Sequence, residues 1–186
     1  MESKYQHHGT ALYGKRAVAI WLLIGVLPLL VQISGNNFLP SPAWIRDVRD
    51  LAMLVGIGTG GFTVWLIVSS VSQSSSNELK KVIAVIASPV LGYCLGATVV
   101  NIAVPMVMAI VFGGPVEMAY VVDQARDADE KYCRSSVTFQ GAPFPFDRVC
   151  GVSDTFRKTL QPGTNIVATG RGTKYGLFVS DLEKAK

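Results

Sequence analysis

Residues 82–112 read VIAVIASPVLGYCLGATVVNIAVPMVMAIVF and contain no Asp, Glu, Lys, Arg or His. A membrane-spanning helix needs about 20 mostly apolar residues to cross about 30 Å of hydrocarbon. A straight helix over this run would be about 46 Å long, which exceeds that thickness. We therefore predict one tilted or kinked helix that protrudes from the bilayer, with Pro89 and Pro105 as kink candidates. Two spans joined by a turn between Gly96 and Asn101 are the alternative.

Two further stretches, Ala17–Ser34 and Leu51–Asn77, also lack charged residues, which make up only 16% of the chain. Typical soluble domains contain about 25% charged residues, and a water-soluble core needs no such segregation. We therefore predict an integral membrane protein in contact with the lipid bilayer, rather than helices buried in a globular core. Its α-helical membrane region is expected over residues 17–114, with three transmembrane helices near residues 17–34, 51–71 and 82–112, the third long and extended.

The basic residues near the ends of these runs predict an orientation. Lys15 and Arg16 precede the first run, as in a signal peptide, but the run is long for one and no A-x-A site follows. Cytoplasmic loops carry an excess of Lys and Arg. The N-terminal tail and the second loop carry more of these residues than the first loop (Lys4, Lys15, Arg16, Lys80 and Lys81 against Arg46 and Arg49). We predict that the tail, residues 1–16, is cytoplasmic and the C-terminus is outside.

Two cysteines, Cys133 and Cys150, lie in the polar C-terminal region. In an oxidising compartment they are disulfide candidates, and such a loop closure stabilises a domain by about 3 kcal/mol. A metal site or thiol catalysis is disfavoured because the histidines, His7 and His8, lie at the opposite terminus and no C-x-x-C motif occurs. We expect no cofactor. No N-x-S/T sequon occurs, so the bacterial inner membrane, with the C-terminus in the periplasm, is the predicted location.

The residue pattern changes after the third apolar run, where charged and turn-forming residues become frequent. Residues 115–132 are predicted to form a helical connector, since Met118, Val121 and Val122 give a partial apolar face. Residues 133–186 alternate between short apolar segments and turn residues, which predicts a small β-rich, disulfide-closed, extracytoplasmic domain. Its segment ATGRGTKYG, Ala168–Gly176, is interpreted as part of a hairpin with arms Ile166–Thr169 and Tyr175–Ser180, in which GRGTK, Gly170–Lys174, supplies the reversal. A phosphate-binding loop would precede a helix, whereas a strand pattern follows here.

Several residues of this domain are candidate partner contacts. Arg171 and Lys174 at the hairpin reversal would meet an acidic partner or lipid headgroups, or would simply be solvated. Phe144 and Phe146 belong either to the core or to a docking surface. The core interpretation is favoured for most of the aromatic residues, because a domain of this size is marginal without every large apolar side chain.

Small residues recur at a spacing of four within the second and third runs. This spacing places them on one helix face, where another helix can approach closely. They predict tight packing, either between the two spans or against another protein or a second copy (Gly56, Gly60, Ser88, Gly92 and Gly96). Asn101 is the strongly polar residue inside the third run. It is expected to hydrogen-bond across helices or to a carbonyl freed by Pro105, in preference to a substrate.

These observations narrow the classes of function. The net charge of +4 is spread out without a basic stripe, so nucleic acid is not an expected partner. No ionisable residue lies in the spans, which disfavours transport chemistry. We expect a non-catalytic accessory or binding subunit of an envelope complex, including an immunity or exclusion protein, which contacts another membrane or envelope protein. A self-associating, homo-oligomeric channel or transport component is the alternative. An enzyme using Asp147 and Asp154 is the least favoured class.

Overall fold

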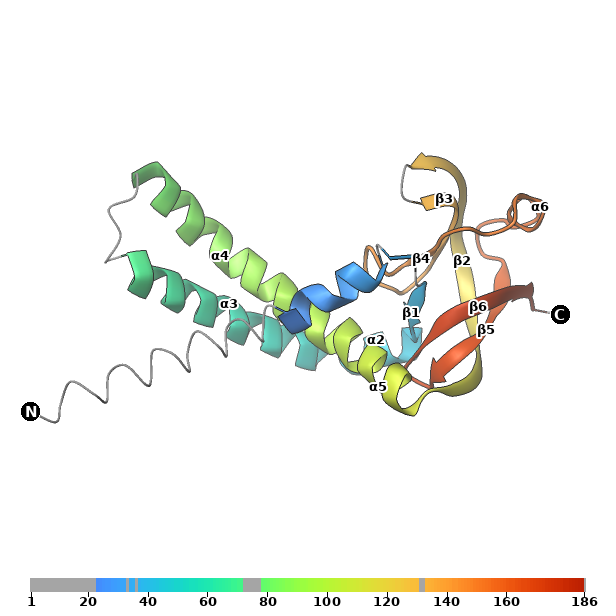
Figure 1. Ribbon diagram of the computed structural model, residues 1–186, viewed down its shortest axis with the longest axis horizontal. Helices are drawn as coiled ribbons and strands as arrows, with labels where there is room; N and C mark the ends of the chain where they lie inside the picture. Colours follow the sequence, from blue (N-terminus) through green and yellow to red (C-terminus); the bar gives the residue numbers. More distant parts are fainter. Residues whose placement is uncertain (1–22, 33, 36, 72–77, 131–132, 186) are drawn as a thin grey trace, which may run out of the picture.

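The computed structural model describes residues 23–32, 34–35, 37–71, 78–130 and 133–185, and Figure 1 shows a helical part at one end and a sheet at the other. Two helical segments, Arg49–Val68 and Val85–Phe112, are long and apolar enough to cross a membrane. A shorter apolar helix covers Leu23–Gln32. The predicted cytoplasmic tail and the start of the first predicted span lie outside the described residues. The count of three spans therefore stays a prediction.

The helical part consists of an antiparallel pair followed by a bend. After the short α2 (Pro42–Asp47), α3 covers Arg49–Val71 and α4 covers Glu78–Thr98. The long apolar run continues without a reversal through a π-helical turn, η1 (Val99–Ala103), into α5 (Val104–Phe112). In η1 the Val104 N–H donates to the Val99 carbonyl, a spacing of five residues. This irregularity lies next to Pro105, which has no N–H to donate.

Glycines hold α3 and α4 close together. A Cβ added at Gly92 would lie 2.9 Å from the Cα of Gly60, and one added at Gly96 would lie 3.0 Å from the Cα of Gly56. Real Cβ atoms do not approach so closely, so these positions accept no larger residue without a shift of a backbone. The regular spacing of four thus acts within the chain, between its own two helices.

Threonine hydroxyls add hydrogen bonds across the same contact. Thr59 Oγ1 donates to the Gly92 carbonyl at 2.8 Å, and Thr63 Oγ1 donates to the Ser88 carbonyl at 3.0 Å. Ser88 itself is buried, and its hydroxyl donates to the Val85 carbonyl at 2.9 Å. Such hydrogen bonds fix the position of α3 along α4, because the glycines in this contact offer no side chains that could do so.

Six strands form one antiparallel sheet in the order β1-β6-β5-β2-β3-β4. They are β1 (Phe38–Pro40), β2 (Gly114–Glu130), β3 (Cys133–Phe139), β4 (Arg148–Val149), β5 (Asn165–Thr173) and β6 (Gly176–Lys184), with a four-residue helix α6 (Asp154–Arg157) between β4 and β5. The sheet curls into a barrel-like form because β2 carries two register shifts and pairs with β5 along one part and with β3 along the other. The two edge strands, β1 and β4, approach each other, although they are not hydrogen-bonded neighbours in the sheet.

Residues 115–132 do not form the predicted helical connector. Residues 115–130 belong to β2, in which Val116, Met118, Tyr120 and Val122 alternate with more exposed residues and face the barrel core. The segment contains β-branched and aromatic residues, and its apolar period is two rather than 3.6. The β domain also starts earlier than Cys133, because β1, from the loop predicted between the first two spans, supplies its edge strand.

The predicted hairpin near the C-terminus is present, but its arms are longer than expected. β5 and β6 pair from Ile166–Lys184 to Thr173–Gly176, and the chain reverses at Lys174 and Tyr175. The glycines of this segment allow close approach of backbones. A Cβ on Gly172 would collide with the carbonyl of Gly176, and one on Gly176 would lie 2.6 Å from the ring of Phe38.

Two apolar clusters organise the sheet and its attachment to the helices. The barrel core consists of Leu39, Tyr120, Val122, Val137, Phe139, Val149, Leu160, Ile166, Ala168 and Leu177. A second cluster, here called the junction cluster, packs α5 against the barrel wall (Phe38, Ile102, Met106, Ala109 and Phe146, with Val31 and Phe178). Since α5 continues α4, the junction cluster couples the barrel directly to the helical pair.

Candidate functional site

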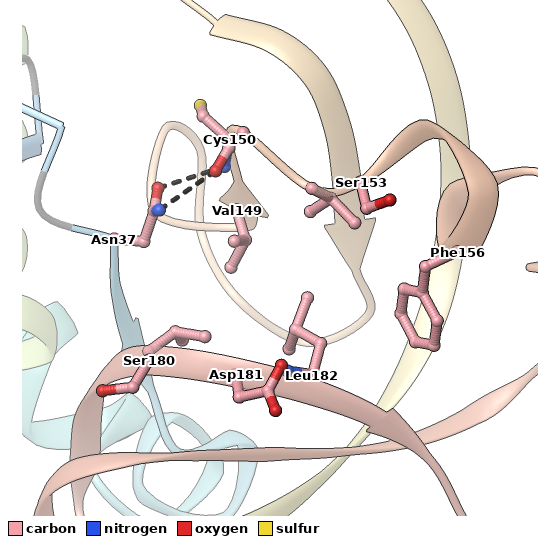
Figure 2. A pocket seen from close by; sticks show the side chains of 11 residues that line it. Asn37, Val149, Cys150, Ser153, Phe156, Ser180, Asp181 and Leu182 are labelled. Carbon is pink, nitrogen blue, oxygen red and sulfur yellow. Dashed lines mark hydrogen bonds between the residues drawn. The ribbon is translucent and has the colours of Figure 1, made fainter.

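A groove of about 450 Å³ opens on the barrel where β6 faces the segment that follows β4, as Figure 2 shows. Polar and apolar groups both contribute to its surface. The lining residues are Asn37, Val149, Cys150, Gly151, Val152, Ser153, Phe156, Val179, Ser180, Asp181 and Leu182. The groove thus exposes part of the barrel interior where the sheet is closed by its shortest strands.

Asn37 closes one end of this groove through two hydrogen bonds. Its Nδ2 donates to the Cys150 carbonyl at 3.1 Å, and the Cys150 N–H donates to Asn37 Oδ1 at 3.1 Å (Figure 2). The side-chain amide therefore pairs with the backbone as a neighbouring strand would. Asn37 directly precedes β1, so these bonds tie the β1 edge of the sheet to the β4 edge.

The predicted disulfide between Cys133 and Cys150 is confirmed, with a sequence separation of 17. Cys133 begins β3 and Cys150 lines the groove, so the bridge and the Asn37 amide hold the same short segment from two sides. The groove wall is therefore constrained covalently as well as by hydrogen bonds. Cys94, on α4, is a free and exposed cysteine outside this domain.

The opposite wall of the groove is an open strand edge. β1 pairs with β6 only from Gly176 to Phe178, and the Val179 N–H then donates to the Asn37 carbonyl at 2.9 Å. From Asp181 to Lys184, β6 pairs with β5 alone within the described residues, and Ser180 is the residue skipped at a register shift. Unpaired backbone groups on such an edge can accept an added strand. The arrangement therefore suits an extended peptide segment lying in the groove beside β6.

The polar groups of the groove are already partly engaged. Asp181 Oδ1 accepts the Leu182 N–H at 2.8 Å, and the hydroxyls of Ser153 and Thr155 lie 2.7 Å apart. Within the described residues no three His, Cys, Asp or Glu side chains are close enough to hold a metal ion. The groove thus offers shape, backbone groups and a mixed polar and apolar lining, with no three-ligand metal cluster among the described residues.

The two candidate carboxylates for catalysis lie outside the groove lining and beside arginines. Asp147 Oδ1 accepts a hydrogen bond from Arg148 Nε at 3.2 Å. Asp154 Oδ1 accepts one from Arg157 at 3.2 Å. Hydrogen bonds from Arg157 and then Ser135 hold the pKa of Asp154 below its usual range. A carboxyl group stabilised in its ionised form is a poor proton donor.

The predicted partner contacts are scattered. Phe146 is buried in the junction cluster, in line with the core alternative that the sequence favoured for most of the aromatic residues. Phe144 is 75% exposed and lies 4.9 Å under the Arg148 guanidinium. Arg171 is exposed and donates from Nε to the Gly113 carbonyl at 3.1 Å, and Lys174 is exposed in the β5–β6 turn. None of these four residues is among the described lining of the groove.

Asn101 does not accept the expected hydrogen bond across helices. It lies in η1, and its buried Oδ1 has no hydrogen-bond partner among the described residues. If the five-residue spacing of the Val104–Val99 bond is continued, the Val100 carbonyl would need the N–H that Pro105 lacks, and Trp44 Nε1 donates to this carbonyl at 3.3 Å. Sequence reasoning did not find this role for Trp44, nor the roles of Asn37 and β6 in the groove. Each depends on a contact between distant parts of the chain.

Comparisons of this chain with protein-family models, with curated proteins and with solved structures yield no match.

Proposed function

We propose that this chain is a membrane-anchored, non-catalytic binding subunit of an envelope complex. In this proposal α3 and α4 anchor the protein, and the barrel binds an extended segment of a partner protein in its groove. An immunity or exclusion protein, which blocks an incoming macromolecule, is one form of this function. The observation that carries the proposal is the open edge of β6 beside the groove, on a barrel packed against the end of an apolar helical pair.

The outer surface of the helices supports anchoring in a bilayer. Only 17% of the Arg49–Val68 window is buried, although its mean hydropathy is 2.0. A core helix of a soluble protein would be mostly buried. α3 has 23 residues, which corresponds to about 35 Å and is close to the thickness of the bilayer hydrocarbon. Large apolar side chains exposed on the helices include Leu54, Ile57, Trp65, Ile86, Val90 and Phe112.

The disulfide and the basic residues near the helix ends support a periplasmic location for the barrel. A disulfide persists in an oxidising compartment, and the barrel contains one. α2 and α5 adjoin the barrel, whereas the end of α3 and the start of α4 lie at the far end of the helical pair (Figure 1). Lys80 and Lys81 belong to the first turn of α4. Together with the basic N-terminal tail, this favours a bacterial inner membrane with the N-terminus cytoplasmic and the barrel periplasmic.

The helix packing favours the binding role over the alternative of a homo-oligomeric channel. Gly56 and Gly60, which would have lined a path or packed against a second copy, are buried against α4 of the same chain. The surface of small residues that Gly56 and Gly60 form on α3 is therefore covered by α4 of the same chain. The groove, by contrast, has no occupant from the described part of the chain.

The groove can be tested by filling it. Ser180 lines the groove and is exposed, whereas Gln161 is exposed in the loop between α6 and β5. The tagged full-length protein and its Ser180→Trp and Gln161→Trp variants would be purified in mild detergent from membranes of the native cells. Mass spectrometry would then identify and quantify what is co-purified.

A stoichiometric partner that is lost with Ser180→Trp and retained with Gln161→Trp is the expected result. A partner retained equally by both variants would remove the groove from the proposal. A homo-oligomer of wild-type protein with no foreign partner would contradict the accessory role and would favour the channel alternative.

A further inference from the structure

A second pocket of about 450 Å³ lies at the junction of the barrel and the helices. We call it the interfacial pocket. Its walls come from α2, from the first residues of β2 and from the turn between β5 and β6, and its polar residues are Ser41, Arg46, Glu117 and Lys174. Figure 1 places α2 between the start of α3 and the sheet. The pocket is separate from the groove, since the two share no lining residue.

Two cationic side chains from distant parts of the chain line the interfacial pocket. Arg46 belongs to α2 and Lys174 to the β5–β6 turn, and both side chains are exposed. Within the described residues neither makes an ion pair, although Lys174 Nζ lies 5.1 Å from the centre of the Tyr175 ring. Glu117 supplies one carboxylate to the same pocket. The lining therefore has two positive charges and one negative charge.

The position of the interfacial pocket relates it to the proposed membrane surface. The rings of Trp44 and Tyr175 pack edge to face with centroids 4.8 Å apart, and each belongs to an element that lines the pocket. Trp and Tyr concentrate where a membrane protein passes from hydrocarbon to water. Immediately after α2, the apolar outer surface of α3 begins with exposed Leu51 and Leu54. A lipid with its headgroup in the pocket would thus have apolar surface nearby for its acyl chains.

We propose that the interfacial pocket binds the headgroup of an aminophospholipid such as phosphatidylethanolamine. The phosphodiester anion lies between Arg46 and Lys174, and the primary ammonium group is held by Glu117. A guanidinium and an ammonium group are good donors to phosphate oxygens. The lining has charges of both signs, as this headgroup does, and the carboxylate gives the ammonium group a partner that an amine-free headgroup would not use. This inference rests on the membrane anchoring of the proposed function.

The test compares lipids and variants by native mass spectrometry. Full-length protein in detergent is mixed with phosphatidylethanolamine, with phosphatidylglycerol, which has no amine, or with inorganic phosphate. The variants are Arg46→Gln/Lys174→Gln, Glu117→Gln and the exposed, distant Lys158→Gln as a control for loss of a cation. We expect wild type and Lys158→Gln to retain phosphatidylethanolamine preferentially, and the double variant to lose about tenfold or more of that binding. Glu117→Gln should abolish the preference over phosphatidylglycerol.

Equal retention of phosphatidylethanolamine by wild type and by the double variant overturns the proposal. So does equal binding of the two lipids by the wild-type protein. If inorganic phosphate binds and neither lipid does, the pocket is a site for a soluble anion and the lipid assignment is wrong. Carbonate extraction of membranes separates these failures from a failure of the proposed function. Protein released by carbonate would contradict anchoring itself, whereas protein that stays embedded without lipid preference would contradict only the pocket.

Discussion

Trp44 Nε1 donates a hydrogen bond to the carbonyl oxygen of Val100 at 3.3 Å, and this bond satisfies a backbone group that the helix itself cannot satisfy. In the π-helical turn the Val104 N–H donates to Val99, so the Val100 carbonyl would need the N–H of residue 105. Residue 105 is a proline and has no N–H. The bond therefore joins α2 to the bend of the long helix, beside the cluster of Val48, Ala52 and Val100.

The first prediction tests this relationship with a double-mutant cycle. Trp44→Phe keeps an aromatic ring but leaves the Val100 carbonyl unpaired, which should lower the free energy of unfolding by about 1–3 kcal/mol. In a Pro105→Ala background the cost should be smaller, because residue 105 can then donate an N–H to the helix. Chemical unfolding of the four proteins in detergent measures both costs. Equal costs in the two backgrounds would mean that the indole acts by packing alone.

A second prediction concerns the glycine contact between α3 and α4. Gly92→Leu should destabilise the helical pair by about 1–3 kcal/mol, because a side chain there meets Gly60 and the hydroxyl of Thr63. Gly58→Leu is the matched control, since nothing lies within 4 Å of a Cβ at that position. Thermal unfolding in the same detergent compares the two. Similar melting temperatures for both variants would show that the close approach contributes little to stability.

The disulfide leads to a third prediction. In a Cys94→Ser background, the thiols of Cys133 and Cys150 should resist maleimide in whole cells until a reductant is added. Replacing both cysteines by serine should lower the free energy of unfolding of the barrel by about 3 kcal/mol, as expected for closure of a loop with a sequence separation of 17. Ready labelling without reductant would instead show that Cys133 and Cys150 are reduced thiols in the cell. That result would argue against a periplasmic barrel.

A fourth prediction follows from the burial of Tyr120 in the barrel core. Burial raises the pKa of Tyr120 above its ordinary value of 10.0, so the folded protein keeps the phenol protonated where the unfolded chain ionises. The stability of the barrel should therefore be constant with respect to this group below about pH 10 and should fall as the pH rises further. Guanidinium unfolding across that range measures the slope. Tyr120→Phe should show a smaller alkaline loss than wild type, and an identical loss would assign the effect to other groups.

Much of the helical part was predictable because its determinants are local. Val82–Phe112 is apolar throughout, and its length alone implies a helix longer than a bilayer needs. The spacing of Gly92 and Gly96 defines one helix face whatever lies opposite it, although only the structure shows that α3 of the same chain occupies that face. The pairing of Cys133 with Cys150 was likewise accessible, since no other cysteines lie in the polar region.

The β domain was harder to predict because its strands are made by distant partners. The apolar residues of Gly114–Glu130 fit a partial helix face as well as a strand. The pairing of this segment with β5 and β3 favours the strand. Phe38–Pro40 is too short to be predicted as a strand from the sequence. It nevertheless completes the sheet and brings Asn37 to Cys150.

By itself the sequence determines the apolar runs, the small-residue faces and the disulfide, because each depends on composition or on spacing along a few helical turns. Tertiary structure alone decides which elements meet. It places Arg46 and Lys174 around one pocket, leaves β6 open beside the groove and supplies Trp44 to the carbonyl of Val100. These contacts join residues far apart in the chain, and only the folded backbone brings them within reach of one another.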